Sequence, residues 1–124
     1  MPEEGLLKST LYLFDSLKRG SIKDFLDEVS YPFNLDGLEL RNEEALREAL
    51  EGRFAAADLS GLRFYGVQTL PAATALERYG PAPKRLAAVD LSEAWVSVAN
   101  FGGHGYVAVF VKKGRRWRAV AYSD

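Results

Sequence analysis

The chain has 124 residues with 16 basic and 17 acidic side chains, which gives a formal net charge of −1. That balance excludes a general electrostatic attraction to nucleic acid or to an anionic membrane surface. Cysteine is absent, which excludes disulfides, thiol catalysis and thiolate metal ligands. The length predicts a single domain over residues 1–124, large enough to bury a hydrophobic core.

The N-terminus and the hydropathy of the chain predict a cytoplasmic protein of a bacterium or archaeon. Residues 1–5 are acidic and polar, unlike the basic start of a secretory signal. No apolar run approaches the roughly 20 residues of a membrane span. Gln68 is the only glutamine, and Leu, Ala, Arg and Glu are abundant. This bias indicates a thermophile, although the codon usage of a GC-rich genome explains it equally well.

Three helices are predicted in the first half of the chain. Residues 2–19 carry an apolar stripe at helical spacing, and Gly20 is suited to end that helix. Ser21 is expected to cap a second helix that stops near Ser30, because Pro32 favours an extended residue before it. Asn42 is expected to cap a third helix. Its predicted inner face holds Leu46, Ala49, Leu50 and Phe54.

Strands dominate the predicted remainder of the chain. Residues 31–36 and 38–41 predict two short strands joined by a turn at Asp36 and Gly37. A strand is expected at 62–70 and a short helix at 71–79. Residues 84–91 are ambiguous between strand and helix, and strand is favoured. A clear alternation predicts a strand at 94–100, followed by a loop or bulged turn at 101–105.

The C-terminal segment 106–122 predicts a β-hairpin around which the sheet is organised. Two runs rich in β-branched and aromatic residues flank a short polar gap that contains Gly114, and glycine supplies the positive φ of a tight turn. Alternation predicts that Trp117, Ala119 and Ala121 share one face of the second strand. The opposite face is predicted to hold Arg116, Arg118 and Val120.

This order predicts an α+β fold: a curved antiparallel sheet with three helices of the N-terminal half packed on its concave face. The segments 17–20, 31–37 before 42–47, and 109–120 together resemble the nuclear transport factor 2-like superfamily. That superfamily has a cystatin-like cone shared with ketosteroid isomerases and polyketide cyclases. The resemblance covers nearly the whole chain and leaves residues 71–83 as a departure.

The resemblance implies three catalytic positions, which this chain does not match. The isomerase base falls on Asn34, the tyrosine on Leu13 and the acid on Val107. Asparagine cannot accept a proton at a useful pH. Asp36 shares the predicted face of Asn34 and is the candidate substitute as general base, although an Asp before Gly is also ordinary turn chemistry.

His104 is the second candidate base, since histidine titrates near neutral pH. It is the only histidine and sits among glycines, which is also typical of an exposed loop. With no cysteine, no second histidine and no clustered carboxylates, no metal site is expected. The glycines at 102–105 lack the lysine and the following helix of a phosphate-binding loop, and no cofactor is expected.

Aromatic side chains from several predicted elements face one interior. They either line an apolar ligand pocket or fill a core. The residues predicted to bind a ligand are Tyr12, Asn34, Trp95, Tyr106 and Trp117. The basic cluster at 112–118 is expected to be a solvated turn and outer sheet face, or alternatively part of a subunit interface or an anion-binding rim.

Three functions follow as expectations. The first is binding of a small apolar or aromatic ligand in the cone, by a homodimer that associates through the outer sheet face. The second is an isomerase, dehydratase or cyclase with Asp36 or His104 as general base. The third is a dimerisation module whose core is filled.

Overall fold

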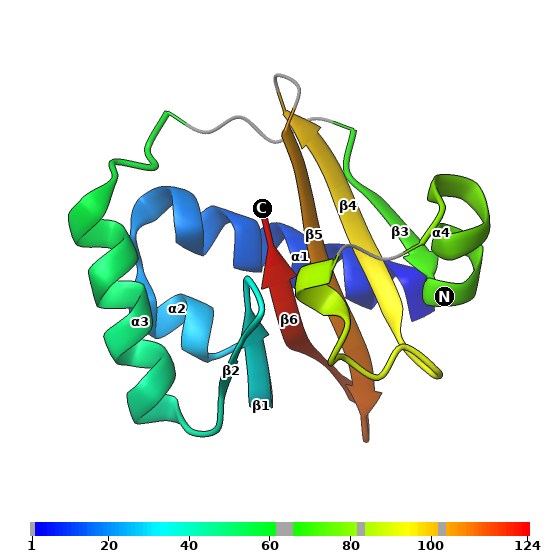
Figure 1. Cartoon of the computed structure of the whole chain (residues 1–124), viewed down its shortest axis with the longest axis horizontal. Helices are drawn as coiled ribbons and strands as arrows, with labels where there is room; N and C mark the ends of the chain where they lie inside the picture. Colours follow the sequence, from blue (N-terminus) through cyan, green and yellow to red (C-terminus); the bar gives the residue numbers. More distant parts are fainter. Residues whose placement is uncertain (1, 62–65, 82–83, 102–103) are drawn as a thin grey trace.

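The computed structural model describes residues 2–61, 66–81, 84–101 and 104–124. Within them the chain forms four α-helices, a short 3-10 helix (η1) and six strands (Figure 1). The helices are α1 (Pro2–Arg19), α2 (Ile22–Leu26), α3 (Glu43–Ala56), α4 (Ala72–Tyr79) and η1 (Lys84–Leu86). The strands are β1 (Val29–Leu35), β2 (Leu38–Leu40), β3 (Gln68–Pro71), β4 (Trp95–Phe101), β5 (His104–Lys113) and β6 (Arg116–Ser123).

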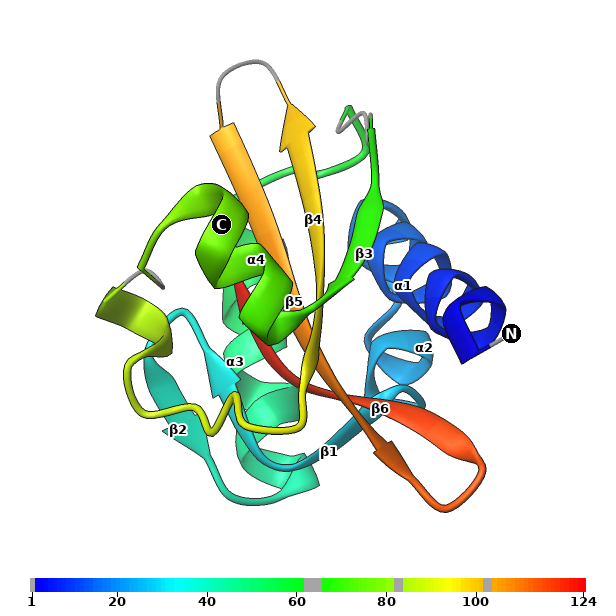
Figure 2. The same cartoon turned by 90° about the vertical axis from the view of Figure 1, so that its right-hand side faces the viewer.

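The strands form one curved sheet in the order β2-β1-β6-β5-β4-β3. The predicted α+β class is confirmed, and α1, α2 and α3 pack on one face of the sheet as expected (Figure 2). The sheet is mixed rather than wholly antiparallel, because β1 pairs in parallel with β6. The helix α4 and η1 cover part of the opposite face, which we call the outer face.

Local capping residues place the helices where the sequence predicts them. Gly20 follows α1 with φ of 68°, a conformation that glycine adopts without steric cost. The Ser21 hydroxyl accepts a hydrogen bond from the Asp24 amide at 3.3 Å. The Asn42 side chain accepts one from the Ala45 amide at 2.8 Å, which begins α3. These caps satisfy amides that have no partner within a helix.

The second helix is shorter than predicted. It ends at Leu26, and β1 already begins at Val29, so the expectation that it continues to Ser30 is wrong. The reason is competition from the sheet: the Ala119 amide of β6 donates to the Glu28 carbonyl at 2.7 Å. Pairing with β6 therefore holds this segment extended before Pro32 is reached.

The inner face of the sheet holds the main core. Its largest fully buried side chains have at most 1% of their surface exposed, namely Phe14, Phe25, Phe33, Phe110 and Tyr122. Phe25 and Phe33 meet edge to face with centroids 5.7 Å apart, as do Phe14 and Tyr122 at 6.4 Å. Such pairs add to the stability that burial provides. Among the described residues, the interior between α1–α3 and the sheet is therefore densely packed with side chains.

A second, smaller core lies on the outer face. It joins Ala72 of α4 and Leu86 of η1 to Val96, Val109 and Ala121 of the sheet. The position of Ala121 corrects the predicted alternation of β6. The register between β5 and β6 shifts so that Val109 faces Ala121 while Phe110 faces Ala119. This bulge turns Ala121 to the outer face, away from Trp117 and Ala119.

The preference for a strand over residues 84–91 is wrong. The segment begins as η1 and continues in turns, with the Ala87 amide donating to the Lys84 carbonyl at 3.1 Å. The Val89 amide donates to the Leu86 carbonyl at 3.0 Å. The strand nearest in sequence, β4, already has partners on both sides, so it offers no free edge to this segment. The backbone groups of residues 84–89 form hydrogen bonds within the segment instead.

Two other predicted boundaries differ. The strand predicted at 62–70 is described only as β3, from Gln68 to Pro71, and residues 62–65 of that prediction lie outside the described residues. The loop predicted at 101–105 is largely strand, because Phe101 pairs with His104 and continues the ladder of β4 and β5. Residues 102–103 lie outside the described part of the chain. Among the helices that are described, none is long and apolar enough to cross a membrane.

Candidate binding site

Two of the aromatic residues predicted to bind a ligand belong to the inner core. Trp95 and Trp117 meet edge to face at 6.0 Å, and only 8% of the Trp117 surface is exposed. Tyr106 is half-buried and packs against the same core. Burial raises the pKa of the Tyr106 hydroxyl above its ordinary value.

Tyr12 and Asn34 lie apart from the tryptophans and serve local structure. Tyr12 is 41% exposed on the outside of α1, and a hydrogen bond with Asp24 raises the pKa of its hydroxyl. Asn34 is buried, and its side-chain oxygen accepts a hydrogen bond from the Gly37 amide at 2.8 Å. The structure thus does not gather the five predicted residues around one cavity.

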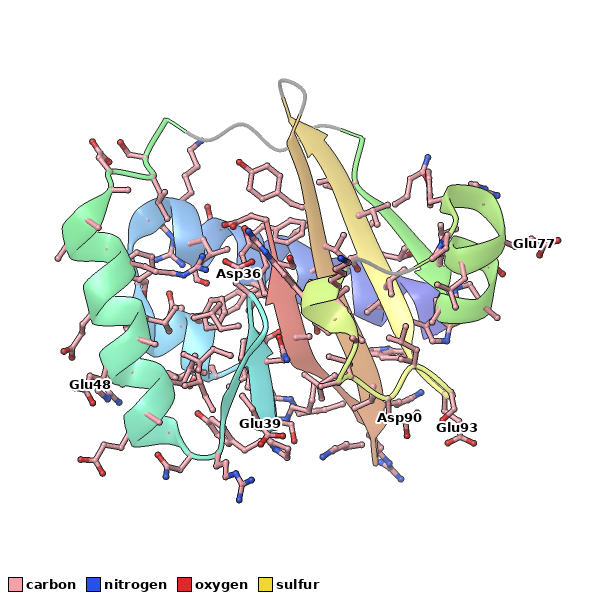
Figure 3. The ribbon with its side chains drawn as sticks, viewed as in Figure 1. Asp36, Glu39, Glu48, Glu77, Asp90 and Glu93 are labelled. Carbon is pink, nitrogen blue, oxygen red and sulfur yellow. The ribbon has the colours of Figure 1, made fainter. Side chains whose placement is uncertain are left out.

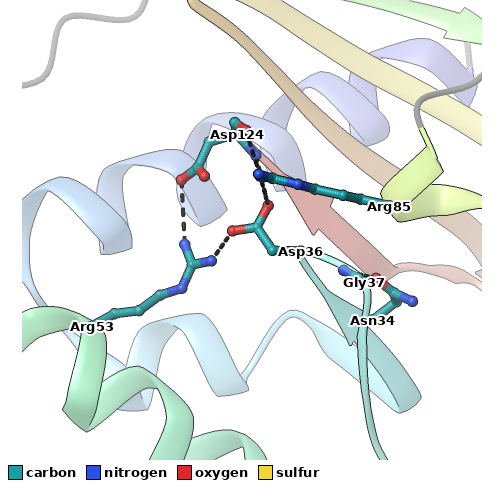
Figure 4. Close-up of polar contacts among 6 residues, drawn as sticks. All are labelled: Asn34, Asp36, Gly37, Arg53, Arg85 and Asp124. Atoms are coloured by element: carbon teal, nitrogen blue, oxygen red, sulfur yellow. Dashed lines mark hydrogen bonds and ion pairs between the residues drawn. The ribbon is translucent and has the colours of Figure 1, made fainter.

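Asp36 sits at the centre of a polar network (Figure 4). Its carboxylate, 14% exposed, pairs with Arg53 of α3 and with the Arg85 guanidinium of η1 at 3.2 Å. It also accepts a hydrogen bond from the Asp124 amide at 3.1 Å. Arg53 further pairs with the Asp124 carboxylate at 3.3 Å. The network ties together α3, η1, the β1–β2 turn and the chain's last residue.

This environment favours a structural role for Asp36. Its backbone has φ of 51°, a left-handed conformation that aspartate tolerates better than most residues. Both carboxylate oxygens are already engaged by cations or by an amide, so a substrate proton would have to displace one of these partners. The side chain of His104, the other candidate base, lies outside the described part of the structure.

The basic cluster is also occupied by local contacts. The Arg116 guanidinium pairs with Glu28 at 3.1 Å, and Arg118 donates to the Asp27 carbonyl at 2.7 Å. Lys113 donates to the Ser30 hydroxyl at 2.8 Å, and the Lys112 ammonium lies 5.8 Å from the Trp117 ring centroid. The first three contacts anchor the turn of the β5–β6 hairpin to residues 27–30, and the fourth lies within the hairpin itself.

Several carboxylates of the described residues lie far from one another. Figure 3 shows Glu48, Glu77 and Asp90 on well-separated parts of the fold, at α3, at α4 and after η1. Within the described ranges, no group of three or more carboxylate or histidine side chains is placed to hold a metal ion.

A largely apolar hollow among the described residues lies on the outer face, beneath α4, and we call it the outer pocket. Its volume is about 540 Å³. Its apolar lining includes Ala72, Ala75, Leu76, Leu86, Val96 and Val98. Gln68 and Tyr79 contribute side chains with hydrogen-bonding groups, while Tyr106, which packs against the inner core, only borders the outer pocket. The Tyr79 hydroxyl donates to the side-chain oxygen of Gln68 at 2.8 Å, which links the end of α4 to β3.

The outer pocket was missed because much of its lining comes from residues 71–83, the segment that departs from the family resemblance, and from Leu86 and Leu91 beyond it. One signal was nevertheless present. Ala72, Ala75, Leu76 and Tyr79 recur at helical spacing and form one apolar face of α4. The first two are small, so a helix that packs through them leaves space beside it. Volume left unfilled by alanine is not visible in a hydrophobic pattern.

No family model matches this chain, and no match was found among curated proteins or among solved structures.

Proposed function

We propose that this protein binds a small apolar molecule in the outer pocket. The observation that carries the proposal is an apolar hollow of about 540 Å³ with a few hydrogen-bonding side chains at its edge. Ligand sites in proteins typically enclose about 300–1,000 Å³ and have this kind of lining. The proposed ligand is of the class that the sequence predicts. Its proposed binding site lies on the outer face of the sheet, and not on the inner face as predicted.

The surface beside the pocket supports the same proposal. Leu76 is 39% exposed and Tyr79 is 57% exposed, although both lie on the apolar side of α4. A ligand seated beneath α4 would remove part of this apolar surface from water, at a gain of about 25 cal/mol per Å². The helix itself packs on the sheet through the small Ala72, which is 2% exposed.

Filling the outer pocket should abolish binding. We expect Ala75→Phe to weaken binding of the neutral dye N-phenyl-1-naphthylamine at least tenfold, because the added ring occupies the ligand's volume. The measurement is dye fluorescence on titration with protein. Ala73→Phe is the matched control, since Ala73 is exposed on the same helix and should leave dye affinity unchanged. Equal dye affinity in the wild type and Ala75→Phe would refute the proposed site.

The homodimer remains a prediction of the sequence. Part of the outer sheet face is covered by α4 and η1, which leaves less of that face available to a second chain than a bare sheet would offer. Light scattering at high micromolar concentration measures the mass directly. A monomer under those conditions would exclude the dimer and leave the proposed ligand site unaffected.

A further inference from the structure

We propose that the natural occupant of the outer pocket is electrically neutral and carries one hydroxyl-like polar group, held at the Gln68–Tyr79 end. This inference rests on the proposed function and narrows the class of ligand. Two observations support it. No described residue that lines the pocket is charged, and the side chains of Tyr79 and Gln68 form a hydrogen bond.

The described lining of the outer pocket is uncharged, in contrast to that of two other hollows of the protein. None of the described residues that line it is an Asp, Glu, Lys or Arg. The hollow between α1, α2 and β6 is lined in part by Lys8, Asp27, Glu28, Arg116 and Arg118. The hollow beside the segment 88–93 includes Glu39, Asp90, Glu93, Lys112 and Lys113. Charged residues therefore line these two hollows but not the described part of the outer pocket.

A charged ligand would bind poorly in such a place. A carboxylate or ammonium group that enters the pocket loses its water, and the described lining offers no opposite charge in return. Leaving an ion without a partner in an apolar site is far less favourable than leaving a neutral polar group there. A hydroxyl group loses much less hydration free energy when it enters the pocket. Hydrogen bonds to the protein compensate for that loss.

The Gln68–Tyr79 pair is suited to a group that both donates and accepts. Because the Gln68 oxygen accepts from Tyr79 at 2.8 Å, the Gln68 side chain presents its N–H groups as donors. The Tyr79 oxygen keeps acceptor capacity while it donates. A ligand hydroxyl can accept from Gln68 and donate to Tyr79, whereas a carbonyl can only accept. The remaining apolar body would lie against Ala75, Val96 and Val98.

Three probes with the same ring system test this inference: 2-naphthalenemethanol, 2-naphthoate and 2-methylnaphthalene. Each competes with N-phenyl-1-naphthylamine at pH 7, and its affinity is obtained from the loss of dye fluorescence. We expect the alcohol to bind at least tenfold more tightly than the carboxylate and several-fold more tightly than the hydrocarbon. The double variant Gln68→Leu, Tyr79→Phe should lower the affinity of the alcohol to that of the hydrocarbon and leave the hydrocarbon unchanged.

The outcomes separate this inference from the proposed function. If none of the probes or the dye binds, the proposed function itself is wrong. If the carboxylate binds as tightly as the alcohol, the site exists but the inference of a neutral ligand is overturned. If the alcohol binds no better than the hydrocarbon, or if the double variant retains the preference for the alcohol, the polar end is assigned wrongly. Both substituted residues are exposed, and an unchanged melting temperature verifies that the double variant is folded.

Discussion

Phe110→Ala should lower the free energy of unfolding by about 3–5 kcal/mol, the usual cost of emptying a fully buried aromatic site. Phe110 has no exposed surface and lies on β5 at the centre of the inner core. The loss combines the transfer free energy of the ring with the cavity that it leaves. Urea denaturation measures the change as a lower midpoint at a similar slope.

The same variant tests whether binding in the outer pocket is independent of packing in the inner core. Since Phe110 belongs to the inner core, the folded variant should bind the dye in the outer pocket as the wild type does. Leu38→Ala is the control, because Leu38 is 58% exposed and its truncation should change stability by no more than about 0.5 kcal/mol. A loss below about 1 kcal/mol in Phe110→Ala would contradict the filled inner face.

Asp36→Ala should lower the free energy of unfolding by about 2–4 kcal/mol. The change leaves Arg53 and Arg85 without their shared carboxylate and removes the acceptor of the Asp124 amide. Breaking a fully buried ion pair costs about 3–5 kcal/mol, and the partly exposed guanidinium groups reduce that figure. Alanine also tolerates φ of 51° less well, which adds about 1 kcal/mol. Thermal denaturation gives the measurement.

Two further variants test the origin of this loss, one at Asp36 itself and one as a control at an exposed ion pair. Asp36→Asn keeps a residue type that adopts the left-handed conformation and removes only the charge, so its loss should be smaller than that of Asp36→Ala. Glu39→Ala breaks an exposed pair with Arg41 and should be nearly neutral. A wild-type melting temperature for Asp36→Ala would refute the structural role, and the role of Asp36 as a general base would regain support.

The fold was largely predictable because its signals are local. Gly20, Ser21 and Asn42 terminate or begin helices through their own backbone preferences and side-chain caps. The hairpin of β5 and β6 follows from two apolar runs around Gly114, whose φ is 64°. Each of these features depends on a few neighbouring residues.

The features that escaped prediction depend on contacts distant in sequence. The bulge that moves Ala121 to the outer face is set by pairing with β5, and the early start of β1 is set by pairing with β6. The ion pairs of Asp36 reach Arg53 and Arg85, and its carboxylate also accepts from the Asp124 amide, so its partners lie on separate parts of the chain. The outer pocket needs α4 to cross the sheet at one particular place, and no periodicity in the sequence encodes that placement.

We propose that an apolar ligand binds on the outer face of the sheet, whereas side chains occupy the inner face. The most direct test is a set of nuclear Overhauser effects from the ring protons of 2-naphthalenemethanol to assigned protein methyl groups. We predict contacts with Ala75 and Val98, which line the outer pocket. Contacts with Leu13 and Leu46, which are fully buried in the inner core, would contradict this proposal and place the ligand between the helices and the inner face of the sheet.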